Sequence, residues 1–231
     1  MKVDYGKIEI NFTLEYSDRK TLGIKVLPDA SVKVIAPLET KDEEIFEKVK
    51  TKAKWILKQQ KIFLDYQPGT PERLYKNGET HLYLGRQYLL QIETSKEAGI
   101  KLLHGKMIVH TPDSESNTVE KIIKNWYREK ALALFEKMLN ERLLQFDKYQ
   151  ITKPIIQIRW MAKRWGSCTK DGKITLNPEL IKAAKPCIDY VIIHELCHLV
   201  HHNHTRDFYN LQLNMCPDWQ HWKNKLEKTL A

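Results

Sequence analysis

Several features that would assign this chain to a specialised class are missing from its sequence. The longest aliphatic and aromatic runs, such as residues 190–193, are far too short to span a bilayer. Only 9 glycines and 9 prolines occur in 231 residues, which excludes collagen-like and low-complexity proteins. The 4 cysteines form no Cys-x-x-Cys pair, and a chain of this size does not need disulfides. The first residues contain no apolar signal segment, so we expect a cytoplasmic protein with reduced thiols and no membrane association.

The composition is that of a globular protein with an excess of positive charge. Hydrophobic residues make up 42% and charged residues 29%, which suits one large or two small domains. The formal net charge of +9 favours anionic partners such as nucleotides, nucleic acid or acidic polypeptides, without selecting one. Six of the lysines lie in residues 48–61, a stretch that we interpret as a solvated helix face rather than a binding surface.

Apolar periodicity predicts an α+β protein. The N-terminal half is predicted to be rich in strands, with one helix that opens with the capping box Thr40-x-x-Glu43 and runs to about residue 64. The predicted strands of this half are residues 8–14, 22–27, 32–35, 81–84, 88–92, 100–103 and 107–110. The polar residues 111–117 suggest a boundary between a strand-rich region, 1–115, and a second region, 116–231. We find no internal repeat in the sequence.

The second region is predicted to contain a long helix, a small sheet and a shorter helix that carries the functional residues. The spacing Asn117-x-x-Glu120 has the form of a capping box and predicts a helix from there to about residue 146. A strand follows at residues 155–159, and then a hairpin with Asp171 and Gly172 at its turn. The next helix is expected at residues 186–202.

This last helix contains a His-Glu-x-x-His motif at residues 194–198. Histidines at positions i and i+4 lie on one helix face, so His194 and His198 can bind one metal ion. Glu195 lies beside them, where it can take a proton from a metal-bound water. The motif alone is expected by chance in about one chain in forty of this length, so it needs support from other residues.

A third metal ligand is expected shortly after the helix. His204 follows a turn at Asn203, a residue type that tolerates the left-handed conformation at helix ends, and three histidines with one open position describe a catalytic zinc site. His201 could compete, but three ligands on consecutive turns of one straight helix do not converge tetrahedrally on an ion. We therefore prefer His204 and expect His201 to support the site or to face the substrate.

These residues resemble the YgjP-like metallopeptidases, small zincins related to the SprT-like proteases. The similarity lies in the run from His194 to Leu199 and in the later residues Asn203, His204, Thr205, Phe208, Pro217 and Trp219. A second similar segment comprises residues 164–168 with Gly172, Ile174, Leu176 and Asn177. The resemblance implies a zincin-like C-terminal region, one zinc ion held by His194, His198 and His204, and Glu195 as the general base. Another divalent transition metal is compatible with the same ligands.

Other residues of the site remain as candidates. Metal-bound histidines need hydrogen-bond acceptors behind them, for which Asp189, Asp207 and Asp218 are candidates. A donor must stabilise the charge that develops in the transition state, and the candidates for this or other substrate contacts are Arg159, Arg164, His201 and Tyr209. The segment from Trp165 to Cys168 could line a cleft that receives extended peptide, although Trp165 as a core residue is the simpler interpretation.

Three hypotheses about function follow. The leading one is a zinc-dependent metallopeptidase that acts on polypeptides. An alternative is a metal-dependent hydrolase of nucleoside triphosphates or other phosphoanhydrides at the same site, although the sequence has no glycine-rich phosphate loop. The third is a non-catalytic, basic, DNA-associated protein, for which we find no recognisable nucleic-acid motif.

Overall fold

The computed structural model of the chain describes residues 1–6, 8–27, 29–65 and 73–230. Its Cα positions form two compact units, residues 1–70 and 71–231, which are described separately here. Both units contain groups of strands followed by helices, which confirms the predicted α+β class. The boundary expected between residues 115 and 116 falls inside the second unit, because the helix that begins there packs on the strands that precede it.

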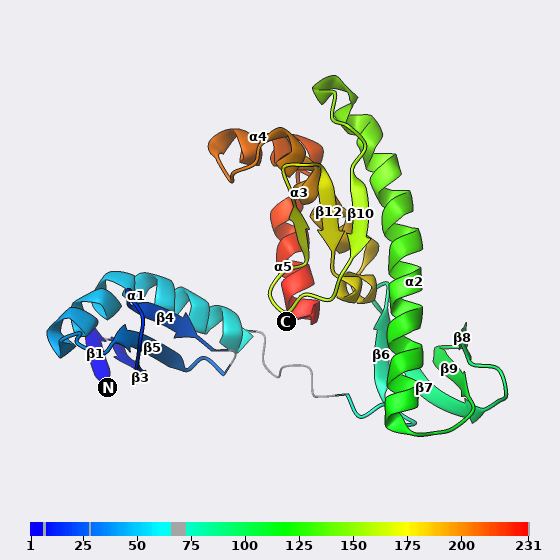
Figure 1. The fold of residues 1–231 in the computed structure, drawn as a ribbon, viewed down its shortest axis with the longest axis horizontal. Helices are drawn as coiled ribbons and strands as arrows, with labels where there is room; N and C mark the ends of the chain where they lie inside the picture. The colour runs from blue at the N-terminus through cyan, green and yellow to red at the C-terminus, as the bar shows by residue number, and fades with distance from the viewer. Residues whose placement is uncertain (7, 28, 66–72, 231) are drawn as a thin grey trace. The chain divides into compact units, whose positions relative to one another are not determined.

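The first unit consists of a hairpin, a three-stranded sheet and one helix (Figure 1). The hairpin pairs β1 (Lys2–Tyr5) with β2 (Ile8–Asn11). The sheet has the order β3-β5-β4, with β3 (Thr13–Ser17) parallel and β4 (Gly23–Val26) antiparallel to β5 (Val32–Pro37). Helix α1 (Asp42–Asp65) follows β5 and contributes buried residues at i, i+4, i+8 and i+11 to an aliphatic core, namely Ile45, Val49, Ala53 and Ile56.

The second unit contains two sheets joined by a long helix. The first sheet has the order β6-β7-β9-β8, from β6 (Thr80–Tyr83), β7 (Arg86–Thr94), β8 (Gly99–Leu103) and β9 (Lys106–Thr111). Helix α2 (Ser116–Leu143) and a 3-10 turn (Leu144–Tyr149) lead to the second sheet, of order β10-β12-β11. Its strands are β10 (Ile155–Ile158), β11 (Gly166–Cys168) and β12 (Lys173–Leu176). A 3-10 turn (Pro178–Lys182) then precedes α3 (Lys185–Val200), α4 (Arg206–Met215) and α5 (Trp219–Leu230).

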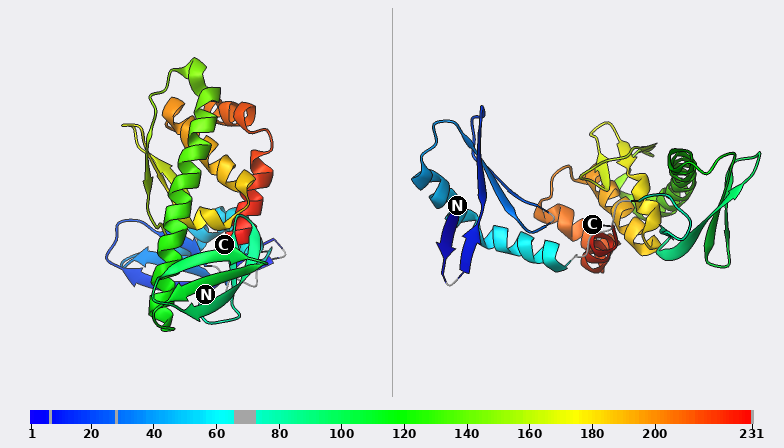
Figure 2. Two further views of the ribbon diagram at one scale, coloured as in Figure 1. Left: turned by 90° about the vertical axis from the view of Figure 1, so that its right-hand side faces the viewer. Right: turned by 90° about the horizontal axis from the view of Figure 1, so that it is seen from below.

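Helix α2 organises the second unit. It contacts β8 and β9 of one sheet, β10 of the other and α3, and Figures 1 and 2 show it running along this unit. Its buried residues recur at i, i+4 and i+8, from Val119 through Ile123 and Tyr127 to Ala131, Phe135 and Leu139, as an amphipathic helix requires. They share one core with β9, β12 and α3, so the second unit is a single packed body.

One strand topology occurs three times along the chain. In β3-β4-β5, β7-β8-β9 and β10-β11-β12, the third strand lies in the middle, parallel to the first and antiparallel to the second. Each triplet is followed by a helix, α1, α2 or α3, that contacts its second strand. That strand begins with a glycine each time, at Gly23, Gly99 and Gly166. The three triplets therefore share a strand topology. The only sequence feature that we find in all three is the glycine at the start of the second strand.

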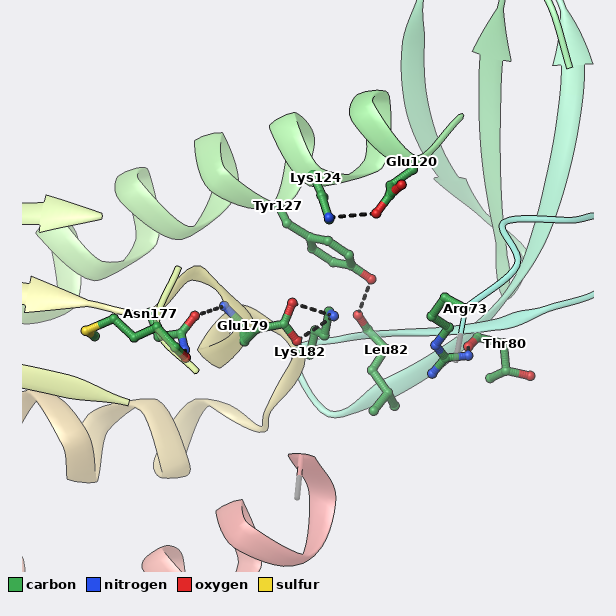
Figure 3. Close-up of polar contacts among 10 residues, drawn as sticks. Arg73, Thr80, Leu82, Glu120, Lys124, Tyr127, Asn177, Glu179 and Lys182 are labelled. Atoms are coloured by element: carbon green, nitrogen blue, oxygen red, sulfur yellow. Dashed lines mark hydrogen bonds and ion pairs between the residues drawn. The ribbon is translucent and has the colours of Figure 1, made fainter. Parts of the chain in front are cut away.

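A network of polar contacts connects α2 with the strands and turns around it (Figure 3). The Tyr127 hydroxyl donates to the Leu82 carbonyl at 2.7 Å, and Lys182 pairs with Glu179 at 2.6 Å. Asn177 accepts from the Glu179 amide at 3.1 Å. The first contact ties α2 to β6, and the other two stabilise the turn that precedes α3. That turn is joined to the end of β6 by the Leu84 amide, which donates to the Ile181 carbonyl at 2.8 Å, and to α2 by Lys182, whose Nζ lies over the Tyr127 ring.

The helix starts show where local sequence signals were misleading. The capping box at Asn117 is wrong, because α2 begins at Ser116 and Asn117 lies inside it. The Asp113 carboxylate instead accepts from the Glu115 amide at 3.0 Å and closes the preceding turn. Among the described residues, no helix is both long and apolar enough to cross a membrane.

Candidate metal centre and active-site pocket

Two helices bring the three predicted ligand histidines together. His194 and His198 lie one turn apart on α3, which ends at Val200, and His201 then takes an extended backbone. Asn203 does not adopt the left-handed conformation expected at this turn. The Thr205 hydroxyl accepts from the Phe208 amide and starts α4, so His204 immediately precedes a new helix that turns back toward α3.

The imidazole rings converge on one point. One ligand nitrogen from each of His194, His198 and His204 lies within 4.8 Å of the other two. The Nε2 atoms of His194 and His204 are 3.1 Å apart, and the rings of His198 and His204 are 4.6 Å apart at their centroids. Phe208 packs against all three rings at centroid distances of 4.6–5.1 Å and forms an apolar floor beneath them.

Hydrogen bonds orient two of these rings. Nδ1 of His194 donates to the amide oxygen of Gln212 at 2.7 Å, and Nδ1 of His198 donates to the backbone carbonyl of His201 at 3.3 Å. Both rings therefore keep Nε2 unprotonated and available to a metal. In the described part of the chain, none of the three predicted aspartates accepts a hydrogen bond from a ligand histidine. Asp189 instead accepts two hydrogen bonds from Arg142, at 2.5 and 2.7 Å. Gln212 is the residue that sequence reasoning missed; its only signal was a polar residue on the buried face of α4.

The donor set fits a divalent transition metal. Burial lowers the pKa of His194 to about 4 and also lowers the pKa of His198, so both imidazoles are neutral at pH 7. Three imidazoles with nitrogens facing one point form the ligand set of a mononuclear zinc site. Such a set also suits cobalt or nickel, since imidazole binds them in the same way.

Glu195 lies beside the histidines as an almost fully buried carboxyl group, with 4% of its surface exposed. Burial raises the pKa of Glu195 to about 8, against the opposite effect of Arg164. Its Oε2 atom is buried without a hydrogen-bond partner in the described structure. A side-chain carbon at Gly166 would collide with this carboxylate, so only glycine lets β11 lie so close to α3. A buried carboxylate oxygen without a partner in the described structure therefore lies beside the three histidines.

Asn177 holds the segment that precedes β11. Its buried side-chain amide donates to the carbonyls of Met161 at 2.8 Å and Arg164 at 3.2 Å. The Asn177 amide donates to the carbonyl of Trp165 at 2.9 Å. One residue thus fixes the approach of the chain to Gly166 and Glu195.

A pocket of about 360 Å³ opens beside the histidines. One wall of the pocket is aromatic, because the Trp219 ring stacks between the rings of Tyr190 and Tyr209. The ring centroids are 6.3 Å and 5.8 Å apart, respectively. The other described lining residues are Arg164, Trp165, Gly166, Val191, His194, Glu195, His204, Lys223 and Glu227.

The predicted substrate contacts divide into two groups. Arg164 and Tyr209 line the pocket, whereas neither Arg159 nor His201 is among its described lining residues. His201 supports the site through its backbone carbonyl alone. Cys168 lies near Glu195, and burial raises the pKa of its thiol to about 11, so it is not a thiolate nucleophile at neutral pH. Trp165 is half-buried and both packs on the core and lines the pocket.

Three histidines around one point, with a buried carboxyl group and a pocket beside them, define the class of mononuclear metal-dependent hydrolases. A family model, the YgjP-like metallopeptidase domain, matches residues 20–229. The chain therefore belongs to the YgjP-like metallopeptidase family, as the sequence motifs predicted. No curated protein matches the chain. The match begins between β3 and β4 and includes α1. The family model therefore covers most of the first compact unit and nearly all of the second.

Proposed function

We propose that this protein is a zinc-dependent peptidase, with His194, His198 and His204 as ligands of one zinc ion and Glu195 as general base. The observation that carries the proposal is the buried, unpartnered carboxylate oxygen of Glu195 next to three converging imidazoles. Zinc bound there would polarise a scissile carbonyl and lower the pKa of a water molecule. The protein supplies the remaining chemistry through the groups that surround this point.

Glu195 is suited to moving a proton. Burial by itself favours the protonated form of Glu195, and a cation held by the histidines would favour the carboxylate. The carboxylate then accepts a proton from the attacking water and returns it to the leaving amine. Arg164 and Tyr209, which line the same pocket, are the proposed donors to the oxyanion that develops on the carbonyl oxygen.

The sheet edge beside Glu195 supports a peptide substrate. In the described sheet β11 is an edge strand, paired with β12 alone. An extended peptide that added to its free edge would pass along Gly166 and therefore along Glu195. The aromatic wall formed by Tyr190, Trp219 and Tyr209 would receive a side chain of that peptide next to the scissile bond.

The phosphoanhydride alternative is supported by two cations in the same pocket. Arg164 and Lys223 both line it, and such groups bind phosphate oxygens. Glu227 also lines it and would repel a triphosphate, which is why we favour the peptide. Measuring pyrophosphate release from nucleoside triphosphates beside cleavage of a peptide library distinguishes the two substrates with one preparation.

The first test combines metal analysis with activity. We expect untagged protein to hold about one equivalent of zinc, which His204→Ala reduces or abolishes. Glu195→Gln should keep the metal and lose activity by at least about 100-fold, because the general base is gone. Glu227→Gln is the matched control, a second carboxylate of the same pocket with no proposed part in the chemistry. Wild-type protein that binds no metal after reconstitution, or an active Glu195→Gln variant, would refute the proposal and leave the non-catalytic alternative.

A further inference from the structure

A second groove lies in the first unit, between α1 and the edge strand β4. It has a volume of about 240 Å³ and is lined by Leu22, Ile24, Lys48, Lys52 and Trp55. Leu22 immediately precedes β4 and Ile24 lies at its start. The other three residues lie on α1 at i, i+4 and i+7, a spacing that puts them on one face. Trp55 is 43% exposed, an unusual position for the largest aromatic side chain of this unit.

This groove occupies the same place in its strand triplet as the active-site pocket does in the third. Both are lined by the first residues of the second strand and by the helix that follows the triplet. In the third triplet those elements are β11 and α3, and in the first they are β4 and α1. The topology thus creates a cleft at this junction, and the side chains determine what the cleft can bind.

The side chains of the groove combine positive charge with an exposed aromatic face. Residues 48–61 of α1 contain six lysines, all exposed, and no acidic residue. Lys58 lies one turn beyond Lys54 and Trp55, so that Trp55 has Lys52 on one side and Lys58 on the other. Of the described contacts, Lys50 has an ion pair, with Glu47 at 3.7 Å, and none is formed by Lys48, Lys52 or Lys58. These lysines are therefore available to an anionic partner.

We propose that this groove binds single-stranded nucleic acid. A base stacks on the Trp55 indole, supported by Leu22 and Ile24, while the neighbouring lysines contact the phosphates on either side. From Lys48 to Lys58 the helix rises roughly 15 Å, enough for several phosphates of an extended strand. Stacking needs exposed base faces, which a duplex does not offer, and an acidic peptide would use the lysines but not the indole.

Direct binding to the full-length protein tests the proposal. The probe is a fluorescent 12-mer of deoxythymidine, followed by anisotropy at two salt concentrations. Trp55→Ala should weaken binding about tenfold or more, and Trp55→Phe should restore most of it, because phenylalanine still stacks. Both variants leave the core intact, since Trp55 is not part of it.

Two double variants that remove the same charge distinguish binding in the groove from non-specific electrostatic attraction of the oligonucleotide to the protein. Lys48→Gln/Lys52→Gln should weaken binding and lower the slope of log K against log salt by about 1.4, the value for two lost phosphate contacts on a single strand. Lys54→Gln/Lys61→Gln removes the same charge from the opposite side of α1 and should change both much less. All measurements are repeated with His204→Ala, so that failure of the peptidase proposal does not affect the result.

Three results would overturn the proposal. The first is no binding at low salt. The second is an equal loss in both lysine pairs without an effect of Trp55→Ala, which would mean non-specific attraction of polyanions. The third is competition by polyglutamate as effective as that by unlabelled oligonucleotide, which would identify an acidic peptide as the partner.

Discussion

The first and third strand triplets have the same topology but build opposite kinds of cleft. At the junction of β11 and α3 the polar groups are buried, with Glu195 only 4% exposed and Gln212 fully buried behind His194. At the junction of β4 and α1 the polar groups are exposed lysines, and the buried face of the helix is entirely aliphatic. Burial shifts pKa values and prepares groups for chemistry, whereas exposure leaves charges for binding. The comparison teaches that one arrangement of strands and helix can form clefts of opposite chemical character.

The two units should differ most in their response to acid. All nine histidines lie in residues 71–231. Burial lowers the pKa of His81 to about 4, with Arg73 acting in the same direction and Glu79 against it. The folded pKa is below the unfolded value of about 6.5, so unfolding takes up a proton and stability is lost as pH falls from 6.5 to 4.

We expect His81 to account for about 3 kcal/mol of unfolding free energy over this pH range. Denaturant melts of wild type and His81→Gln at pH 7.5 and 4.5 measure it as the difference between the two pH dependences. If both proteins lose the same stability, His81 is not the acid-sensitive group of the second unit.

The glycines that begin the second strand of each triplet differ in what surrounds them, so substituting each one tests whether the cleft beside β11 depends on Gly166. A Cβ at Gly166 would collide with the Glu195 carboxylate, at Gly23 it would meet the flexible end of Arg19, and at Gly99 it would meet nothing. Gly166→Ala should lower kcat/KM about 100-fold through displacement of Glu195. Gly23→Ala and Gly99→Ala should remain near wild type in peptide assays. A similar loss at all three positions would point to the strands rather than the site.

Removing the partner of His194 should weaken the metal site. Gln212→Met keeps the volume of the side chain but leaves the Nδ1–H of His194 without its acceptor. We expect metal affinity to fall about 10- to 100-fold, measured by competition with a chelator. The neighbouring Asn214→Ala, on the exposed side of α4, serves as the control. Unchanged affinity in Gln212→Met would mean that the ring is oriented by packing on Phe208 alone.

The smallest effect is expected from ion pairs in the two units. Arg142 and Asp189 join α2 to α3 through two hydrogen bonds, and Asp189→Asn should cost about 1–2 kcal/mol after allowance for solvent screening. The pair between Lys2 and Glu9 in the hairpin is exposed to solvent on both sides, and Glu9→Gln should leave the melting temperature unchanged. Thermal unfolding of the two variants measures this difference. Equal shifts in melting temperature for Asp189→Asn and Glu9→Gln would contradict the prediction.

Much of this fold could be predicted from periodicity. The strand predictions at residues 81–84, 88–92, 100–103 and 107–110 agree with β6 to β9 within a few residues, because alternating apolar residues lie on the core face. The helix predicted from the capping box at Thr40 to about residue 64 agrees with α1 within two residues, because its apolar residues recur at helical spacing. The convergence of the three histidines was also predictable, since i and i+4 spacing fixes two of them.

Other features depend on contacts between residues that are distant in sequence. The Gln212 side chain lies 18 residues from the histidine that it orients, and no local pattern marks it as an acceptor. The strand triplets share an order of pairing rather than a sequence, so a search for sequence repeats could not find them. The helix start at Ser116 was missed because Asp113 uses its carboxylate one turn earlier than the capping pattern suggested.

The repeated triplets also bear on how the chain folds. Each triplet pairs strands that are close in sequence, and its helix follows within about ten residues, so the contacts within it have low sequence separation. Low contact order favours rapid folding, and domains form in the order of their synthesis. We therefore expect residues 1–65 to acquire their sheet and helix on the ribosome before α3 has been translated. The Glu195 carboxylate would be buried last, when the strand that begins with Gly166 closes against α3.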